Sequence, residues 1–262
     1  MNKTDSQSQE SVESFGWQWT ERAVTDSTRS AYHRLFKDMG LWHDHHDGKI
    51  VADVCSGNGR HVWALSRLTK AKKIISVELS VPAADYQRRK FADDPRIETI
   101  QGDAAQVVFA ADFIYLVGAI QHTSEPQKIL KRLFDNLNDG GELLVTFYMV
   151  TPATMVLEPI RQVLKRLPKE VLWSLTVLFA PVFMVRKAGR EAGFRHARFN
   201  AYDWFGSHHY QRYFVTSEIE RMFDAVGVHP DNVLRIGKGV YKVRKGAGPA
   251  LDDQRHSFGA DR

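Results

Sequence analysis

Strand-like and helix-like segments alternate along most of this chain, and the alternation limits the folds that it can adopt. Short apolar runs at 50–54 and 73–79 predict strands, and a segment with helical character follows each of them, at 60–69 and 81–90. Strands that alternate with helices form a parallel sheet that helices cover on both faces. The sequence therefore predicts an α/β fold.

The same patterns continue toward the C-terminus, with one interruption. From residue 151 to 202 the alternation gives way to a basic and apolar helical stretch, which we interpret as an inserted helical cap. Gly140 and Gly141 are expected to stop the helix that precedes the fifth strand. The remaining predicted elements are strands at 96–100, 112–117, 142–148, 232–236 and 239–243, and helices at 126–138 and 217–223.

The composition is that of a globular protein with a buried core. Of 262 residues, 43% are hydrophobic and 26% are charged, and the net charge of +5 does not imply a nucleic-acid partner. Cys55 is the single cysteine, which excludes a disulfide framework and any multi-cysteine metal site. We therefore expect a cytoplasmic protein without a metal.

No targeting or membrane-spanning segment is predicted. Residues 1–13 lack the pattern of a signal or transit peptide and are expected to form a disordered tail, as are residues 246–262. The longest apolar run, at 171–185, contains Pro181 and is shorter than the roughly 20 residues of a spanning helix. Between the tails, we expect a core with N-terminal helices at 14–150, the cap at 151–202 and the end of the core sheet at 203–245.

A glycine turn joins the first predicted strand to its helix. Gly57 and Gly59 let the backbone approach a ligand and present helix N-terminal amides, although a tight connection without a ligand is the alternative. A dinucleotide fingerprint would need a third glycine where Val62 stands, so NAD is disfavoured. The acidic residues Glu78 and Asp103 end the second and third strands, where they can bind ribose and adenine or remain solvated loop acids.

In these features the sequence resembles the class I S-adenosylmethionine-dependent methyltransferases, of the bacterial small-molecule type. The resemblance covers about residues 15–243 and rests on Asp53-Val-Cys-Ser-Gly-Asn-Gly59, Glu78, Gly102-Asp103, residues 118–122 and the glycine pair 140–141. It implies a Rossmann-like sheet of seven strands, mostly parallel with an antiparallel last strand, and S-adenosylmethionine as the cofactor. Residues 15–19, Phe-Gly-Trp-Gln-Trp, resemble a motif that forms a lid over the cofactor in this family.

The resemblance also implies which residues bind the cofactor. One departure is Cys55, because the family commonly has glycine at that position. The implied contacts lie around the methionine end, the ribose, the adenine, the mouth of the fourth strand and the lid: Asp53, Ser56, Gly57, Gly59, Glu78, Leu79, Asp103, Ala104, Val117, Gln121 and Trp19.

The predicted chemistry is methyl transfer to oxygen or carbon of a small, apolar metabolite. The sulfonium donor is already electrophilic, so the enzyme aligns the acceptor, excludes water and removes a proton where one is lost. The Asn/Asp-Pro-Pro-aromatic motif that marks methylation of planar amino groups in this fold is missing, since residues 118–123 read Gly-Ala-Ile-Gln-His-Thr. The alternatives are methylation coupled to cyclisation, other chemistry on the sulfonium, or a catalytically silent binding subunit.

His122 is the first candidate for a general base, because it follows the fourth strand at the ligand-binding edge. Tyr148, at the end of the fifth strand, is a candidate to orient the acceptor, although a core tyrosine is the alternative. Asp203 and His208 lie in an aromatic loop similar to the substrate side of the family, against an alternative of lid packing. His209 next to His208 does not form a metal pair, because neighbouring side chains on a strand point apart.

The cap is the most individual part of the sequence. Between 158 and 198 it carries nine basic and three acidic residues around the long apolar run. It can admit an apolar, anionic substrate or rest on a membrane surface. The alternative that the pattern favours is a buried helix or a homodimer interface, because a surface helix should show a cleaner polar face.

Overall fold

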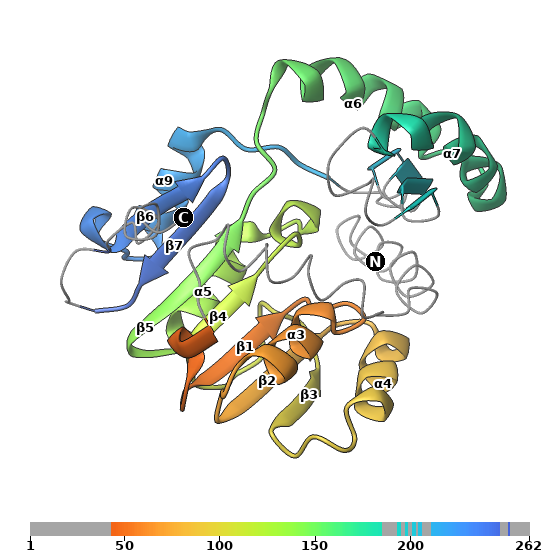
Figure 1. Ribbon diagram of the computed structural model, residues 1–262. Coiled ribbons are helices and arrows are strands. Elements are labelled where there is room, and N and C mark those ends of the chain that lie inside the picture. The colour runs from red at the N-terminus through yellow and green to blue at the C-terminus, as the bar shows by residue number, and fades with distance from the viewer. Residues whose placement is uncertain are drawn as a thin grey trace, which may run out of the picture.

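The computed structural model describes residues 43–184, 193–194, 197–198, 201–202, 204–205, 211–246 and 251, and shows one seven-stranded sheet (Figure 1). The strand order is β3-β2-β1-β4-β5-β7-β6. All neighbouring pairs from β3 to β5 are parallel, while β7 runs antiparallel to both β5 and β6. The predicted fold class is confirmed, including its antiparallel last strand.

The described elements follow the predicted order. The strands are β1 (Ile50–Val54), β2 (Lys73–Glu78), β3 (Ile97–Gln101), β4 (Ala111–Leu116), β5 (Leu137–Thr146), β6 (Val233–Gly237) and β7 (Val240–Arg244). The helices are α3 (Arg60–Leu68), α4 (Val81–Lys90), α5 (Pro126–Asn136), α6 (Pro152–Leu164), α7 (Lys169–Met184) and α9 (Thr216–Ala225), with 3₁₀ turns η1 (His43–His46), η2 (Ile120–His122) and η3 (Pro230–Asn232). None of the helices in the described ranges is long and apolar enough to cross a membrane.

The core has two parts, one on each face of the sheet. On one face, Ile114 of β4 belongs to a buried cluster with Leu130 of α5 and Phe223 of α9. On the other face, Val51 of β1 and Phe113 of β4 belong to a second cluster with Leu65 of α3. Alternate residues of β4 enter opposite clusters, as expected for a strand covered on both sides.

The helix before the fifth strand was predicted to stop at Gly140 and Gly141, and this position is wrong. Helix α5 ends earlier, at Asn136, and β5 already begins at Leu137, which pairs with Ala111 of β4. A register shift between Ala111 and Phe113 takes up the extra residues. Gly140 lies inside β5 with a φ of 75° and donates its N–H to the carbonyl of Lys245. Pairing with β7 and its C-terminal extension therefore draws this segment into the sheet.

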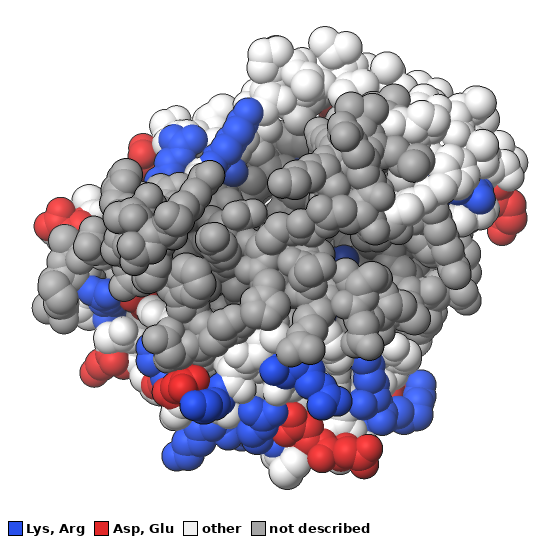
Figure 2. Space-filling model, viewed as in Figure 1, with Lys and Arg blue, Asp and Glu red and all other residues white. Residues whose placement is uncertain are grey.

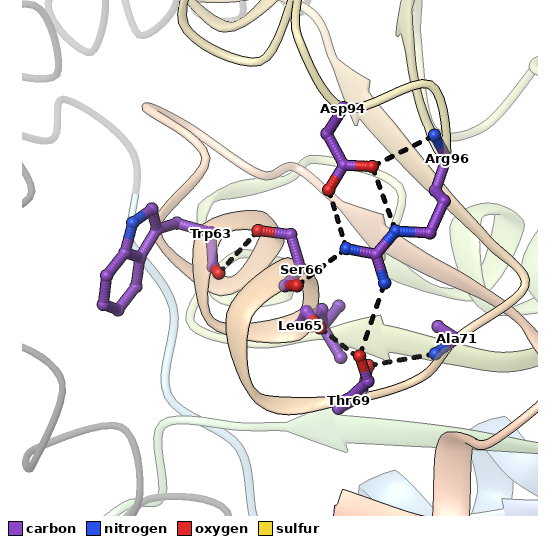
Figure 3. A network of polar contacts seen from close by, with 7 residues as sticks. All are labelled: Trp63, Leu65, Ser66, Thr69, Ala71, Asp94 and Arg96. Carbon is purple, nitrogen blue, oxygen red and sulfur yellow. Dashed lines mark hydrogen bonds and ion pairs between the residues drawn. The ribbon is translucent and has the colours of Figure 1, made fainter.

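A polar network holds the C-terminal end of α3 (Figure 3). The Arg96 guanidinium donates to the carbonyls of Ser66, at 2.7 Å, and Thr69, at 3.4 Å, and it is fixed by the Asp94 carboxylate. The last carbonyls of a helix lack partners within the helix, so the guanidinium provides them. The network fixes the far end of the helix whose N-terminus forms the glycine turn.

A buried ion cluster joins β5 to β7 and to η1. The carboxylate of Glu142 lies 2.9 Å from Arg244, 3.1 Å from His45 and 3.7 Å from the ammonium group of Lys242. Burial alone would raise the pKa of Glu142, but the hydrogen bond with His45 and the charges of Lys242 and Arg244 lower it to about 2. The cluster thus favours an ionised Glu142.

This cluster predicts a dependence of stability on pH. Because the pKa of Glu142 is lower in the folded than in the unfolded chain, its contribution is complete above about pH 4.5 and disappears as the pH falls toward 2. We expect a loss on the order of 3 kcal/mol over that window, measured by urea unfolding. In Glu142→Gln the dependence should be shallower, whereas Glu98→Gln, in an exposed pair with Lys73, should keep it. Equal slopes in all three proteins would contradict the assignment.

Candidate functional site

The glycine turn between β1 and α3 has a left-handed backbone at three positions. The φ angles are 57° at Cys55, 60° at Gly57 and 73° at Gly59, which is the N-cap of α3. A Cβ atom on Gly59 would lie 2.6 Å from Cε2 of Phe91 and 2.8 Å from Oε1 of Gln87. Glycine is therefore required at Gly59, both for its backbone angle and for space. Burial, followed by the charges of nearby carboxylates, raises the pKa of the Cys55 thiol, so the thiol stays protonated.

The side chain of Gln87, on α4, holds the glycine turn through hydrogen bonds. Its Nε2 donates to Oγ of Ser56 and to the carbonyl of Gly57, both at 2.8 Å, and its Oε1 accepts from Oγ of Ser76 at 2.6 Å. Gln87 is fully buried. The sequence analysis missed this residue, although it follows Ala83 by one helical turn on the buried face of α4. The turn is thus fixed by a helix that is distant from it in sequence.

The carboxylate of Glu78, at the end of β2, accepts hydrogen bonds from two backbone N–H groups. Its Oε2 accepts from the N–H of Gly57 at 2.7 Å, and its Oε1 accepts from the N–H of Ser80 at 2.8 Å. Burial raises the pKa of Glu78, and the backbone hydrogen bonds partly oppose that shift. Each carboxylate oxygen has a second lone pair, so the predicted contacts with ribose hydroxyls remain available. Leu79, the next residue, is exposed beside it.

Asp103 lies next to Glu78, at the end of the neighbouring strand β3. The N–H of Gly102 donates to the carbonyl of Glu78 at 3.0 Å, which joins the two strand ends. The carboxylate of Asp103 accepts from the N–H of Ala105 and from Nε2 of Gln106, both at 2.9 Å. These bonds hold Asp103 in a turn at the edge where adenine binding is predicted, with Ala104 buried behind it.

Two buried side chains at this edge have polar atoms without a partner. Asp53 is 1% exposed; its Oδ1 lies 3.5 Å from Nδ1 of His61, and its Oδ2 has no hydrogen-bond partner in the described part of the chain. The amide of Gln121 is fully buried, and among the described residues neither its Oε1 nor its Nε2 is bonded. Such groups are rare because each costs free energy. Strand β1 pairs with β4, and β4 ends just before Val117. Asp53 and Gln121 therefore lie at the same edge of the sheet.

His122 and Tyr148, the two catalytic candidates from the ends of β4 and β5, lie together. Their ring centroids are 5.8 Å apart in an edge-on arrangement. Tyr213 stacks on Tyr148 at 6.3 Å, because the segment that contains it pairs with the end of β5 through the N–H of Phe214 and the carbonyl of Tyr148. The sequence analysis missed Tyr213, since nothing in the local pattern of 211–215 indicates this pairing.

The cap closes over this aromatic group through helix α6. The hydroxyl of Tyr213 accepts from Nε2 of Gln211 at 2.6 Å, and it feels the charge of Glu158 on α6. Burial and the charge of Glu158 raise the pKa of Tyr213, so its hydroxyl remains protonated. Trp19, Asp203, His208 and His209 lie outside the described residues, and their predicted roles stay predictions.

Comparisons with known proteins agree with this geometry. Residues 51–141, which include the turn and the ends of β2 to β4, match the family model described as "Methyltransferase domain". The chain is 24% identical over 112 residues to a demethylmenaquinone methyltransferase of Clavibacter sepedonicus, covering 42% of this chain and 45% of that protein. It is 28% identical over 113 residues to a tRNA U34 carboxymethyltransferase of a Sulfurovum species, covering 39% and 35%. The chain spans less than half the length of these two relatives.

A solved structure shares the fold over nearly the whole chain. It is the 1,6-didemethyltoxoflavin-N1-methyltransferase of Burkholderia thailandensis, with a TM-score of 0.54, 12% identity and coverage of 94% of this chain and 92% of that one. At this identity the likeness shows the fold alone, whereas the family match, the sheet order and the glycine turn define the class of the domain. The chain carries a class I S-adenosylmethionine-dependent methyltransferase domain, and S-adenosylmethionine is the cofactor of that domain.

The described residues fit this cofactor. S-adenosylmethionine offers an ammonium group, two ribose hydroxyls and an adenine amino group, all of which donate hydrogen bonds. The edge of the sheet at the carboxyl ends of β1, β2 and β3 offers the carboxylates of Asp53, Glu78 and Asp103. One oxygen of Asp53 lacks a hydrogen-bond partner among the described residues. The carboxylate end of the cofactor needs donors, which the amides at the N-terminus of α3 provide.

Asp53 offers a test in which affinity and stability change differently. In Asp53→Asn we expect the affinity for S-adenosylmethionine to fall about tenfold or more, because a charge-assisted hydrogen bond is weakened. The free energy of unfolding without cofactor should not fall, because the unsatisfied buried charge is removed. Calorimetric titration and urea unfolding measure the two quantities. Asp85→Asn, in an exposed pair with Arg88, is the control and should change neither. A parallel loss of both quantities would assign Asp53 a structural role.

Proposed function

We propose that the protein transfers the methyl group of S-adenosylmethionine to an oxygen or carbon atom of a small, apolar metabolite. The observation that carries the proposal is the position of the His122–Tyr148 pair. It lies at the carboxyl ends of β4 and β5, on the sheet edge that also holds the cofactor turn after β1. An acceptor above these rings would therefore lie beside the cofactor.

The roles of the residues follow from their chemistry. When bound, S-adenosylmethionine supplies a methyl group that its sulfonium makes electrophilic. His122 would take the proton that the acceptor loses when it is methylated. Tyr148 positions the acceptor with its ring or hydroxyl, and Tyr213 extends the aromatic wall toward the cap. The cap excludes water from the reacting atoms.

The apolar class of acceptor is supported by the walls of this space and by one relative. Tyr148 and Tyr213 provide aromatic surface. The name of the Clavibacter relative, demethylmenaquinone methyltransferase, indicates a quinone as its acceptor, which agrees with a small-molecule acceptor for this chain.

The proposal is tested by binding and by turnover. The full chain should bind S-adenosylmethionine and S-adenosylhomocysteine at micromolar concentration in a calorimetric titration. With the cofactor and a panel of hydroquinones, phenols and enolisable lipids, it should release S-adenosylhomocysteine together with a product heavier by one methyl group. If neither compound binds, the cofactor assignment is wrong; if both bind but the panel gives no product, the acceptor class is wrong.

A second candidate is transfer of a different group, and the relative named a tRNA U34 carboxymethyltransferase favours it. In that case the same edge would bind a sulfonium that carries a carboxymethyl group, and the acceptor would be a base in RNA. The mass of the product distinguishes the two reactions, and an incubation with total tRNA tests the acceptor. Methylated small molecules without tRNA modification would exclude this second candidate.

A further inference from the structure

Helix α6 is amphipathic, but it faces the solvent with its apolar side. One stripe along the helix contains residues at spacings of three and four, and all of them are exposed. Val156 is 68% exposed and Val163 is 64% exposed. The stripe, which we call the outer face of α6, consists of Pro152, Met155, Val156, Pro159, Ile160 and Val163.

The polar side of α6 points inward. Arg161 is only 2% exposed, and its guanidinium holds the carboxylate of Glu158 through two hydrogen bonds of 2.8 Å. The charge of Glu158 in turn acts on Tyr213 and raises its pKa. Arg161 and Glu158 both belong to α6, so the ion pair marks the side of the helix that is turned away from the outer face. The outward position of the apolar stripe is therefore built into the structure.

Helix α7 extends the uncharged surface. Its buried stripe, with Leu172, packs in a small cluster with Tyr202 and Phe205. On the opposite side Val171, Val177 and Leu178 are exposed, followed by Pro181. In Figure 2 the surface over α6 and α7 carries little charge, whereas Lys, Arg, Asp and Glu gather over the lower part of the view. An exposed apolar surface that extends over two helices indicates a partner.

We propose that this surface docks on an anionic lipid bilayer. Lys165 and Arg166 lie at the C-terminal end of the outer face of α6, against one exposed acid, Glu170, on the described part of these two helices. An aliphatic face bordered by basic side chains fits the interface of a bilayer with anionic headgroups.

The docking places the acceptor site next to the membrane. The charge of Glu158 on the inner side of α6 reaches Tyr213, which stacks on Tyr148 beside His122, so the helix that contacts lipid also borders the acceptor space. The proposal does not depend on the reaction, because it concerns only the outer face. It would nevertheless allow a lipid-soluble acceptor to reach the site without crossing water.

The test is flotation of the full chain with vesicles. We expect binding to vesicles of equal parts phosphatidylcholine and phosphatidylglycerol, with weaker binding to phosphatidylcholine alone. The double variant Val156→Asp/Val163→Asp should bind at least tenfold more weakly. Val108→Asp is the matched control, since Val108 is 76% exposed but lies in the loop between β3 and β4. It should bind like the unchanged protein.

Three results would overturn the proposal: no binding of the unchanged protein to either vesicle, equal binding by the double variant, or a dimer in solution that the double variant converts to a monomer while neither protein binds vesicles. The last result would identify the face as an interface between copies. Titration with S-adenosylmethionine separates this test from the proposed function, because the affinity of the double variant should be unchanged. That measurement also shows that the variant is folded.

Discussion

Replacing Gly59 by alanine should destabilise the protein by about 2–4 kcal/mol and abolish cofactor binding at micromolar concentration. The left-handed backbone at Gly59 costs a non-glycine residue about 1–2 kcal/mol. The added methyl group would overlap Phe91 and Gln87, which adds an overpacking cost of about 1–3 kcal/mol. A shift of Gln87 would also release its bonds to Ser56 and Gly57. Urea unfolding and calorimetric titration measure the two effects.

Gly48→Ala is the matched control for this substitution. Gly48 has a φ of 71°, nearly the same as that of Gly59, but no atom lies within 4 Å of the position of its Cβ. It should therefore lose only the backbone part, about 1–2 kcal/mol, and should bind the cofactor normally. If the two variants lose equal stability, the contact with α4 does not constrain the turn, and the account given for Gly59 is wrong.

Replacing His122 by alanine should lower kcat/KM for the methyl acceptor about hundredfold at neutral pH, which is the usual effect of losing a general base. The loss should shrink as the pH rises toward the pKa of the acceptor, because an ionised acceptor needs no base. Affinity for S-adenosylmethionine should change little, since His122 pairs with Tyr148 on the acceptor side. Initial rates across pH, together with a cofactor titration, provide the test.

His229→Ala is the control, because His229 is exposed near η3 and lies outside the site. It should leave the rate and its pH dependence unchanged. A loss in His122→Ala that is equal at every pH would mean that His122 shapes the site without accepting a proton. Tyr148→Phe should then be compared, since it keeps the ring beside His122 and removes only the hydroxyl.

Most of the sheet was predictable because hydrophobic spacing reports local structure directly. The strand at 50–54 and the helix at 81–90 have the predicted bounds, and the strand ends bring Asp53, Glu78 and Asp103 to one edge because they belong to neighbouring parallel strands. The start of β5 was misplaced because pairing with Ala111 overrides the local turn signal of Gly140 and Gly141.

The missed residues act over distances in sequence that a local pattern cannot report. Gln87 bonds to Ser56, 31 residues earlier, and Tyr213 stacks on Tyr148 from the other side of the insertion. The direction of α6 was also beyond the sequence. Periodicity shows that a helix has an apolar stripe, but only the structure shows that Val156 and Val163 face outward while Arg161 is buried.

The position of Gln87 has a consequence for protein design. Residues 53–59 form the recognisable cofactor motif, yet their conformation depends on an amide that belongs to α4 and on the hydroxyl of Ser76 in β2. Copying the motif alone into another α/β protein would leave the carbonyl of Gly57 and the hydroxyl of Ser56 without these partners. The smallest unit that could be grafted with its shape preserved is therefore residues 50–91, two strands and two helices together.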